Sequence, residues 1–296
     1  MYRVFTDEFV GIFFTEIKAT ERLRPPKDHA TIRDVNKSST MTPQLSENQA
    51  QEKLVATPKG QAVVRKRLVR RLLILTLLSI ALAFFLVWLT PADRYELTRS
   101  LFINRPLIFL LLFFALVTVS LLWSFGQRLD EWVFVFFNLR GFHAHWLDRL
   151  MWLGTQIGNM GFAVALAILA YVLGNHNFAI NLMLGVLIAW LIVETIKALT
   201  DRSRPFNLLR ETRIIGWQEP GLSFPSGHTT QTFFVMSLAI HQLQLAPVAA
   251  AALYLIAAFV GLTRIYVGAH YPRDVLAGAT LGLMLGILEA LIAPYL

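Results

Sequence analysis

Cysteine is absent from this chain of 296 residues. The sequence therefore has no disulfide, no cysteine metal site and no thiol nucleophile. Charged residues are scarce as well, at 16% of the chain, whereas a soluble domain usually has about 25%. Hydrophobic residues make up 55%, many of them in long apolar runs. This combination is typical of a protein that lies in a lipid bilayer rather than of one with a large soluble core.

Motifs for nucleic-acid recognition are also lacking, although the net charge is +8. The basic residues fall at the ends of apolar runs, where membrane orientation alone places them. We therefore expect the bilayer, and no nucleic acid, to be a partner of this chain.

The beginning of the chain differs in kind from the rest. Residues 1–64 are polar and show no sustained hydrophobic period, which predicts a disordered tail. Basic residues then gather between Arg65 and Arg71, ahead of an apolar run over 72–89 that is near the lower length limit for a spanning helix. We assign residues 65–105 to this basic cluster and an additional N-terminal membrane helix.

Further apolar runs occupy most of the remaining chain, interrupted by an amphipathic stretch over 129–160. That stretch mixes aromatic and charged residues and predicts helices at the membrane interface; a soluble loop packed on the bundle is the alternative. Helices satisfy their own backbone hydrogen bonds in lipid. The sequence therefore predicts an all-α, multi-pass transmembrane helical bundle of six or seven spans, with its core over 106–296. The further runs lie at 106–125, 161–174, 178–198, 229–245, 247–263 and 275–293.

The first cluster of polar residues follows the run 178–198. Lys197 and Arg204 are seven residues apart, so one helix face can carry both. Pro205 disfavours helix at the residue before it, which places Arg204 at a helix end. These cations are candidates for binding an anion, and charges that snorkel to the membrane boundary are the alternative interpretation.

The second cluster is Pro225-Ser226-Gly227-His228, at the start of the next helix. Gly227 lets the backbone approach a ligand closely. The unpaired N–H groups of a helix N-terminus suit an anion. Ser226 is either part of such a site or a helix cap.

The third cluster is Arg264, His270 and Asp274. His270 and Asp274 are four residues apart, so the carboxylate can accept a hydrogen bond from one imidazole nitrogen and leave the other free as a nucleophile. A His–Asp pair that only holds the start of a helix in place is the alternative. Pro272 suits the first turn of that last helix.

Together the three clusters supply cations, a helix N-terminus and two histidines. Phosphoryl transfer needs such a set, because charge on the equatorial oxygens is balanced while one group attacks in line and another protonates the leaving oxygen. Histidines can divide the last two tasks because their pKa lies near neutral pH.

The motifs Lys197-x6-Arg204-Pro205, Pro225-Ser226-Gly227-His228 and Arg264-x5-His270-x3-Asp274 resemble the three-part signature of the type 2 phosphatidic acid phosphatase family. The resemblance covers residues 106–293. One position departs from the family pattern, since Thr263 stands where the family usually has serine.

The resemblance implies a role for each matched residue. His270 is expected to be the nucleophile that forms a phosphohistidine, oriented by Asp274, and His228 the acid that protonates the leaving group. The expected phosphate-binding residues are Lys197, Arg204, Ser226, Gly227 and Arg264. The family works without a metal, and no acidic cluster of magnesium type lies near these motifs. We therefore expect no cofactor.

Four further polar residues lie near the motifs or within a span. We interpret Glu194 as a structural partner of Lys197. Asp201 and Arg202 are expected to support the site from behind. Glu289 lies within the last span, where an acid is often functional, although a position near the interface is the alternative.

The expected substrate is a lipid phosphate or diphosphate, such as undecaprenyl diphosphate, phosphatidic acid or phosphatidylglycerol phosphate. A lipid phosphotransferase that uses the same site is one alternative, and a non-catalytic transporter or lipid-binding scaffold is another.

Sequence and resemblance conflict over membrane orientation. The resemblance implies a bacterial plasma membrane with the site on the extracytoplasmic face. If all seven apolar runs span, however, the basic cluster lies on the same side as the site, and basic segments favour the cytoplasm. We expect an extracytoplasmic site.

Overall fold

The computed structural model describes residues 87–209 and 211–292, together with positions 69, 72, 73, 76, 77, 79–81 and 83–85. The disordered tail predicted over 1–64 and the basic residues of the cluster that follows it lie outside the described residues. The N-terminal membrane helix expected over 72–89 is described only in part.

The described residues are helical almost throughout and contain no strand, which confirms the all-α class for this part of the chain. The α-helices are α4 (Pro91–Ile103), α5 (Arg105–Ser120), α6 (Ser124–Val135), α7 (His145–Thr155), α8 (Met160–Val172), α9 (His176–Thr200), α10 (Pro205–Leu208), α11 (Gly227–Gln242), α12 (Pro247–Tyr266) and α13 (Pro272–Ile292). A π-helical turn, Phe136–Arg140, follows α6, and a 3-10 turn, Gln156–Gly158, separates α7 from α8.

Local sequence signals set several helix boundaries. Asn104 separates α4 from α5, and its side chain accepts a hydrogen bond from the backbone N–H of Leu107. Asn175 caps α9 in the same way. Proline occupies the first turn of α4, α5, α10 and α12, where its missing N–H leaves no hydrogen bond unmade.

Three stretches of the described residues are long and apolar enough to cross a membrane: His176–Leu208, Pro247–Tyr266 and Pro272–Ile292. Two bent pairs bring the number to five if each is one span: α4 with α5, bent by 66°, and α7 with α8, bent by 58°. The predicted count of six or seven is not confirmed. The run expected over 229–245 forms α11, which has 16 residues and carries histidine, threonine and glutamine side chains in its first turns.

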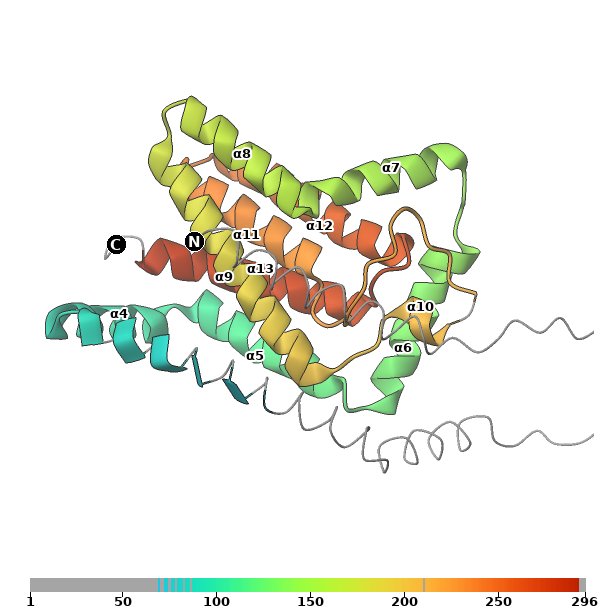
Figure 1. Cartoon of the computed structure of the whole chain (residues 1–296), viewed down its shortest axis with the longest axis horizontal. Helices are drawn as coiled ribbons and strands as arrows, with labels where there is room; N and C mark the ends of the chain where they lie inside the picture. Colours follow the sequence, from blue (N-terminus) through green and yellow to red (C-terminus); the bar gives the residue numbers. More distant parts are fainter. Residues whose placement is uncertain are drawn as a thin grey trace, which may run out of the picture. The chain divides into compact units, whose positions relative to one another are not determined.

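The helices α9, α11 and α13 pack side by side at the centre of the bundle, with α8 against α9 and α12 against α11 (Figure 1). Close approach of α13 to α11 depends on glycine. A Cβ at Gly278 would lie 2.6 Å from the carbonyl oxygen of Ser226, and one at Gly282 would lie 2.5 Å from that of Thr230. This packing holds the beginnings of α11 and α13 together, which is where two of the sequence motifs lie.

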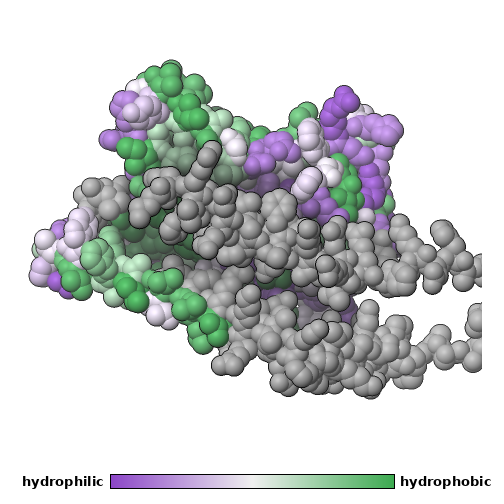
Figure 2. All heavy atoms as spheres, in the orientation of Figure 1, coloured by the Kyte–Doolittle hydropathy of each residue, from purple (hydrophilic) through white to green (hydrophobic). Residues whose placement is uncertain are grey.

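Polar and apolar surfaces are separated along the bundle. Figure 2 shows hydrophobic residues over α8, whereas hydrophilic residues gather at the end where α7 begins and the segment between α10 and α11 lies. Exposed tryptophans occur here as well: Trp132 of α6, Trp146 of α7 and Trp217 are 66%, 64% and 83% exposed. The placement of α6 and α7 at the membrane interface stays a prediction.

Candidate active site

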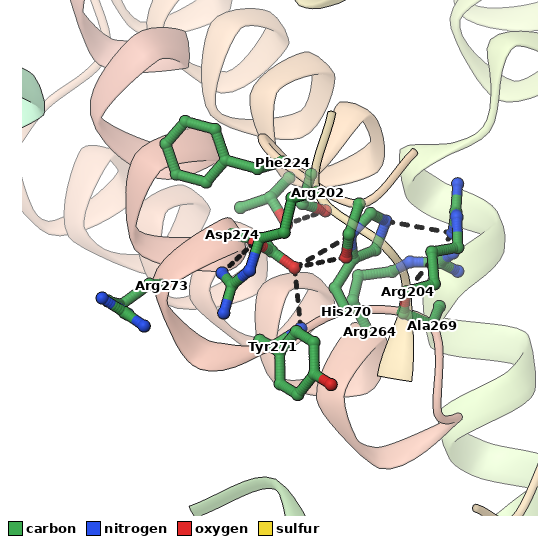
Figure 3. Close-up of polar contacts among 12 residues, drawn as sticks. Arg202, Arg204, Phe224, Arg264, Ala269, His270, Tyr271, Arg273 and Asp274 are labelled. Carbon is green, nitrogen blue, oxygen red and sulfur yellow. Dashed lines mark hydrogen bonds and ion pairs between the residues drawn. The ribbon is translucent and has the colours of Figure 1, made fainter. Parts of the chain in front are cut away.

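The three motifs meet at one end of the bundle. Lys197 lies in the last turn of α9 and Arg204 just before α10, while His228 is in the first turn of α11. Arg264 lies in the last turn of α12, and His270 precedes α13. Helix ends from distant parts of the chain thus converge on one polar site (Figure 3).

His270 is the buried centre of this site, with a side-chain exposure of 1%. Figure 3 shows its imidazole between Asp274 and Arg204. Its Nε2 atom lies 3.4 Å from Arg204 Nη1, whereas its Nδ1 atom lies 3.5 Å from Ser223 Oγ. An arginine N–H can only donate, so we assign the proton to Nδ1 and leave the lone pair of Nε2 facing the cations.

Asp274 does not accept the direct hydrogen bond that its spacing from His270 predicts. Its Oδ2 atom lies 3.7 Å from Nδ1, an ion-pair distance beyond hydrogen-bond range. The reason is local, because Oδ2 already accepts from Ser223 Oγ at 2.5 Å and from the backbone N–H of Tyr271 at 2.9 Å. Ser223 therefore lies between the carboxylate and the imidazole.

Arg202 supports Asp274 from behind, as the sequence predicts. It donates to Asp274 Oδ1 at 2.5 Å, and its guanidinium lies 4.5 Å from the centre of the Tyr271 ring (Figure 3). Asp130 of α6, which is buried, accepts from both Arg202 and Arg273. This chain of charges fixes the start of α13 to α6. Asp201, the other residue expected to support the site, ends α9 in the left-handed region with a φ of 51°.

Arg204 and Arg264 form a buried cationic pair, each with 3% of its side chain exposed. Arg264 donates to Thr155 Oγ1 at 2.6 Å, and both guanidiniums bind the carboxylate of Glu219. The Nε atoms of the two arginines are buried and have no hydrogen-bond partner within the described residues. The pair thus has donors to spare for an anion with several oxygens.

His228 faces the same pocket from α11. Its Nε2 atom lies 3.6 Å from Glu219 Oε1. Gly158 makes room for it, because a Cβ at that position would lie 2.9 Å from the Cβ of His228. The two candidate histidines therefore approach the cations from different helices.

Ser226 does not cap α11 with its side chain. Its Oγ accepts a hydrogen bond from Thr229 Oγ1 at 2.9 Å, and its backbone N–H donates to the carbonyl oxygen of Asp274 at 3.0 Å. The cap interpretation is therefore wrong for the side chain. Gly227 opens the helix, where the first backbone N–H groups have no partner within the helix.

Lys197 and Glu194 form the pair that the sequence predicts, at 2.8 Å between Nζ and Oε1. The positive charge of Lys197 also acts on His270. Burial first, then Arg204 and Arg264, and to a lesser extent Lys197, lower the pKa of His270 well below its usual value. His270 is therefore neutral near pH 7, as a nucleophile must be.

Glu289 takes no part in the site. It lies in the last turns of α13, at the opposite end from His270, and accepts a hydrogen bond from Gln242 Nε2 at 2.6 Å. Within the described part of the chain, no group of three or more His, Asp or Glu side chains is arranged to hold a metal ion.

Four residues of the site have no counterpart in the sequence motifs: Thr155, Asp130, Glu219 and Ser223. Glu219 and Ser223 lie in the irregular segment between α10 and α11, only a few residues before the second motif. An acidic residue so close to a predicted anion site is an anomaly visible in the sequence. Asp130 and Thr155 belong to the amphipathic stretch and give no local signal.

Comparisons with known proteins find similarity over the part of the chain that carries the three motifs. The sequence profile of the family described as "PAP2 superfamily" matches residues 178–296. A solved structure, a transmembrane PAP2 type phosphatidylglycerolphosphate phosphatase from Bacillus subtilis, superposes with a TM-score of 0.54 at 26% identity and covers 62% of this chain and 92% of its own.

Curated relatives match over shorter stretches. An undecaprenyl-diphosphatase from Sulfolobus acidocaldarius is 32% identical over 39% of this chain and 55% of its own, and a lipid A 1-phosphatase from Rhizobium johnstonii is 42% identical over 24% and 28%. This chain thus spans about half the length of the first relative and less of the second. The resemblance seen in the three motifs is confirmed: the PAP2 superfamily profile matches residues 178–296, which contain all three motifs.

Proposed function

We propose that this chain is a membrane lipid phosphatase that removes phosphate from a lipid phosphate or diphosphate through a phosphohistidine at His270. The observation that carries the proposal is the placement of Nε2 of a buried, neutral imidazole 3.4 Å from one of two buried guanidiniums. A phosphoryl group held by these cations lies beside the lone pair that attacks it.

The reaction has two balanced steps. In the first, Nε2 of His270 attacks phosphorus in line and the bond from phosphorus to the lipid oxygen breaks. Burial and Arg264 lower the pKa of His228 to about 3 in the free site, so His228 takes up a proton from solvent as the phosphate dianion binds beside it and gives that proton to the lipid oxygen. In the second, His228 takes a proton from water, the water oxygen attacks phosphorus, and the N–P bond breaks to release inorganic phosphate.

The remaining site residues stabilise charge or position the nucleophile. Arg204, Arg264 and Lys197 balance the charge on the phosphoryl oxygens, and the backbone N–H of Gly227 adds a donor at the start of α11. The backbone N–H of Ser226 is already bound to the carbonyl oxygen of Asp274. Asp274 stabilises the imidazole on its Nδ1 side, with Ser223 between them. The proposed reaction requires no metal or other cofactor, because the arginine and lysine side chains themselves balance the charge on the phosphoryl oxygens.

The proposed substrates are lipids with a terminal phosphate: undecaprenyl diphosphate, phosphatidic acid or phosphatidylglycerol phosphate. The names of the relatives from Sulfolobus and Bacillus refer to substrates of this kind. The site lies at helix ends beside apolar spans, so a headgroup can enter while its acyl chains stay in the bilayer. We place the protein in a bacterial plasma membrane, with a site on the extracytoplasmic face.

The test is a phosphate-release assay on purified protein with these three lipids, with and without a chelator. Replacing His270 with Ala should lower turnover by roughly a thousandfold or more, because the nucleophile is lost. His241→Ala, an exposed histidine at the other end of α11, is the matched control and should keep wild-type activity. Undiminished turnover in folded His270→Ala would overturn the mechanism.

Two further outcomes separate the alternatives. Labelled lipid product in place of free phosphate, when an acceptor lipid is present, would indicate a phosphotransferase. Absence of both turnover and a labelled phosphoenzyme would indicate a non-catalytic membrane protein.

A further inference from the structure

Glu219 occupies the centre of the cationic pocket. Its Oε1 atom lies 2.5 Å from Arg264 Nη2 and 3.6 Å from His228 Nε2, and its Oε2 atom lies 3.1 Å from Arg204 Nη1. Both carboxylate oxygens are therefore bound by the groups assigned above to the phosphoryl oxygens and the leaving group.

The carboxylate lies on the open side of the pocket. Its side chain is 25% exposed, against 3% for each of the two arginines. Among the ion pairs of the described residues, Glu219 is the only acid bound to either Arg204 or Arg264. Burial tends to raise the pKa of Glu219, but the positive charges of Arg264 and Arg204 lower it well below its usual range. The site without substrate therefore contains a resident monoanion.

A phosphoryl group and this carboxylate cannot occupy the pocket together. Arg204 Nη1 lies 3.4 Å from Nε2 of His270 and 3.1 Å from Glu219 Oε2. Any phosphorus within reach of Nε2 brings its oxygens to the same guanidinium face, and two anions in contact repel strongly where water is scarce. Binding of substrate therefore requires Glu219 to leave.

The segment that carries Glu219 has the backbone features for such a movement. Its described residues, 211–226, have no regular structure apart from turns, and Gly216 and Gly221 on either side of Glu219 have φ angles of +83° and +93°. Near Gly221 the space is open, since an added Cβ would meet no atom within 4 Å.

We propose that Glu219 determines specificity as an internal competitor, which a dianionic terminal phosphate displaces and a monoanionic phosphodiester does not. This inference rests on the proposed function. Exchange of a carboxylate for a phosphodiester replaces one negative charge with another, so the pocket gains nothing. Exchange for a terminal phosphate, which carries about −1.5 to −2 charges at pH 7, adds charge opposite two buried arginines.

The consequence concerns the surrounding membrane. Phosphodiester lipids greatly outnumber lipids with a terminal phosphate in a bilayer, and each diester headgroup could otherwise occupy the cations. Glu219 keeps the pocket closed to them and available to the substrate.

Binding measurements in the His270→Ala background test this without turnover. Inorganic phosphate and dihexanoyl phosphatidylglycerol, a short-chain diester, are titrated calorimetrically into protein with Glu219 or with Glu219→Gln. With Glu219 present, phosphate should bind and the diester should not. Glu219→Gln should bind phosphate about tenfold more tightly and gain measurable affinity for the diester, because the competing charge is gone.

Glu211→Gln is the matched control, an exposed glutamate in the same segment, and should bind both probes as the His270→Ala protein does. If Glu219→Gln does not fold, Glu219→Asp keeps the charge but shortens its reach and should show the same changes to a smaller degree. Unchanged or weaker phosphate binding in the folded variant, or continued exclusion of the diester, would overturn the inference. These affinities are independent of the hydrolysis assay, so either proposal can fail alone.

Discussion

At the scale of single residues, the site combines a neutral imidazole with buried positive charge. His270 has a pKa well below its usual value because it is buried and lies beside Arg204 and Arg264. The unprotonated imidazole, which the proposed mechanism requires, is therefore present at pH values where an exposed histidine would already be protonated. Ser223 contributes through its hydroxyl, which donates to Asp274 and lies next to Nδ1.

The same shift predicts how stability depends on pH. Below the ordinary histidine pKa of 6.5, the unfolded chain binds a proton at His270 that the folded chain does not. Stability from this group is therefore present above pH 6.5 and falls with acidification, by at most about 1.4 kcal/mol per pH unit. Glu219 also makes stability fall with acidification, but at lower pH. Its pKa is lower in the folded chain than in the unfolded chain, so the stability that it contributes is lost as the pH falls below the usual glutamate value of 4.5.

Thermal unfolding of phosphate-free protein between pH 8 and pH 5 measures this effect. The unfolding midpoint of the wild type should decrease below about pH 6.5, and His270→Gln should weaken that decrease. His241→Gln, which alters an exposed histidine, should leave the slope as in the wild type. Equal slopes for all three proteins would show that His270 is not buried in its neutral form.

The sequence motifs predict most of the residues in this site, because each motif lies at a helix end and such ends can meet. They do not predict Glu219 or Ser223, whose role depends on how an irregular segment folds back over the helix ends. The prediction of a direct hydrogen bond from His270 to Asp274 was also wrong. Helical spacing does not reveal competing donors such as the Ser223 hydroxyl, which binds the same carboxylate.

At the scale of elements, the site depends on how closely α13 approaches α11. A Cβ at Gly282 would lie 2.5 Å from the Thr230 carbonyl oxygen and 2.6 Å from the Phe233 Cβ. Backbone atoms cannot move aside as a flexible side chain can. The two helices must therefore separate if this glycine is replaced, and the start of α11 moves with them.

Gly282→Ala should accordingly destabilise the protein by about 1–3 kcal/mol, as overpacking does, and lower phosphate release. Gly161→Ala is the control: it lies in α8, where an added Cβ meets its nearest atom at 3.9 Å, and should be neutral or slightly stabilising. Thermal unfolding and turnover of both variants measure the effect. Equal midpoints for the two variants would contradict the close packing of α11 and α13.

Apolar runs predict the helices well, since length and composition decide whether a segment suits lipid. They do not predict kinks and breaks. The run expected over 106–125 forms α5, to which the more polar α4 is joined at a bend of 66°. Whether such a pair makes one span or two depends on how the helices pack, and hydropathy carries no information on packing.

At the scale of the whole molecule, the proposed orientation can be measured by labelling each end of the bundle. The chain has no native cysteine, so single cysteines can report sidedness without background. Trp217 lies at the end of the bundle with the site and is 83% exposed. Ala246 is exposed in the turn between α11 and α12, at the opposite end.

With an extracytoplasmic site, Trp217→Cys should react with a membrane-impermeant maleimide in intact cells. Ala246→Cys should react only after permeabilisation. Both should react in detergent, which shows that each thiol is accessible. The reverse pattern would place the site in the cytoplasm and favour the orientation that the basic cluster indicates.

The carboxylate of Glu219 also bears on how the molecule is made. Two buried arginines with no counter-charge would hinder assembly, because an unpaired buried charge costs several kcal/mol. Glu219 supplies that counter-charge from within the chain. The helices that carry these two arginines can therefore pack together without a bound headgroup.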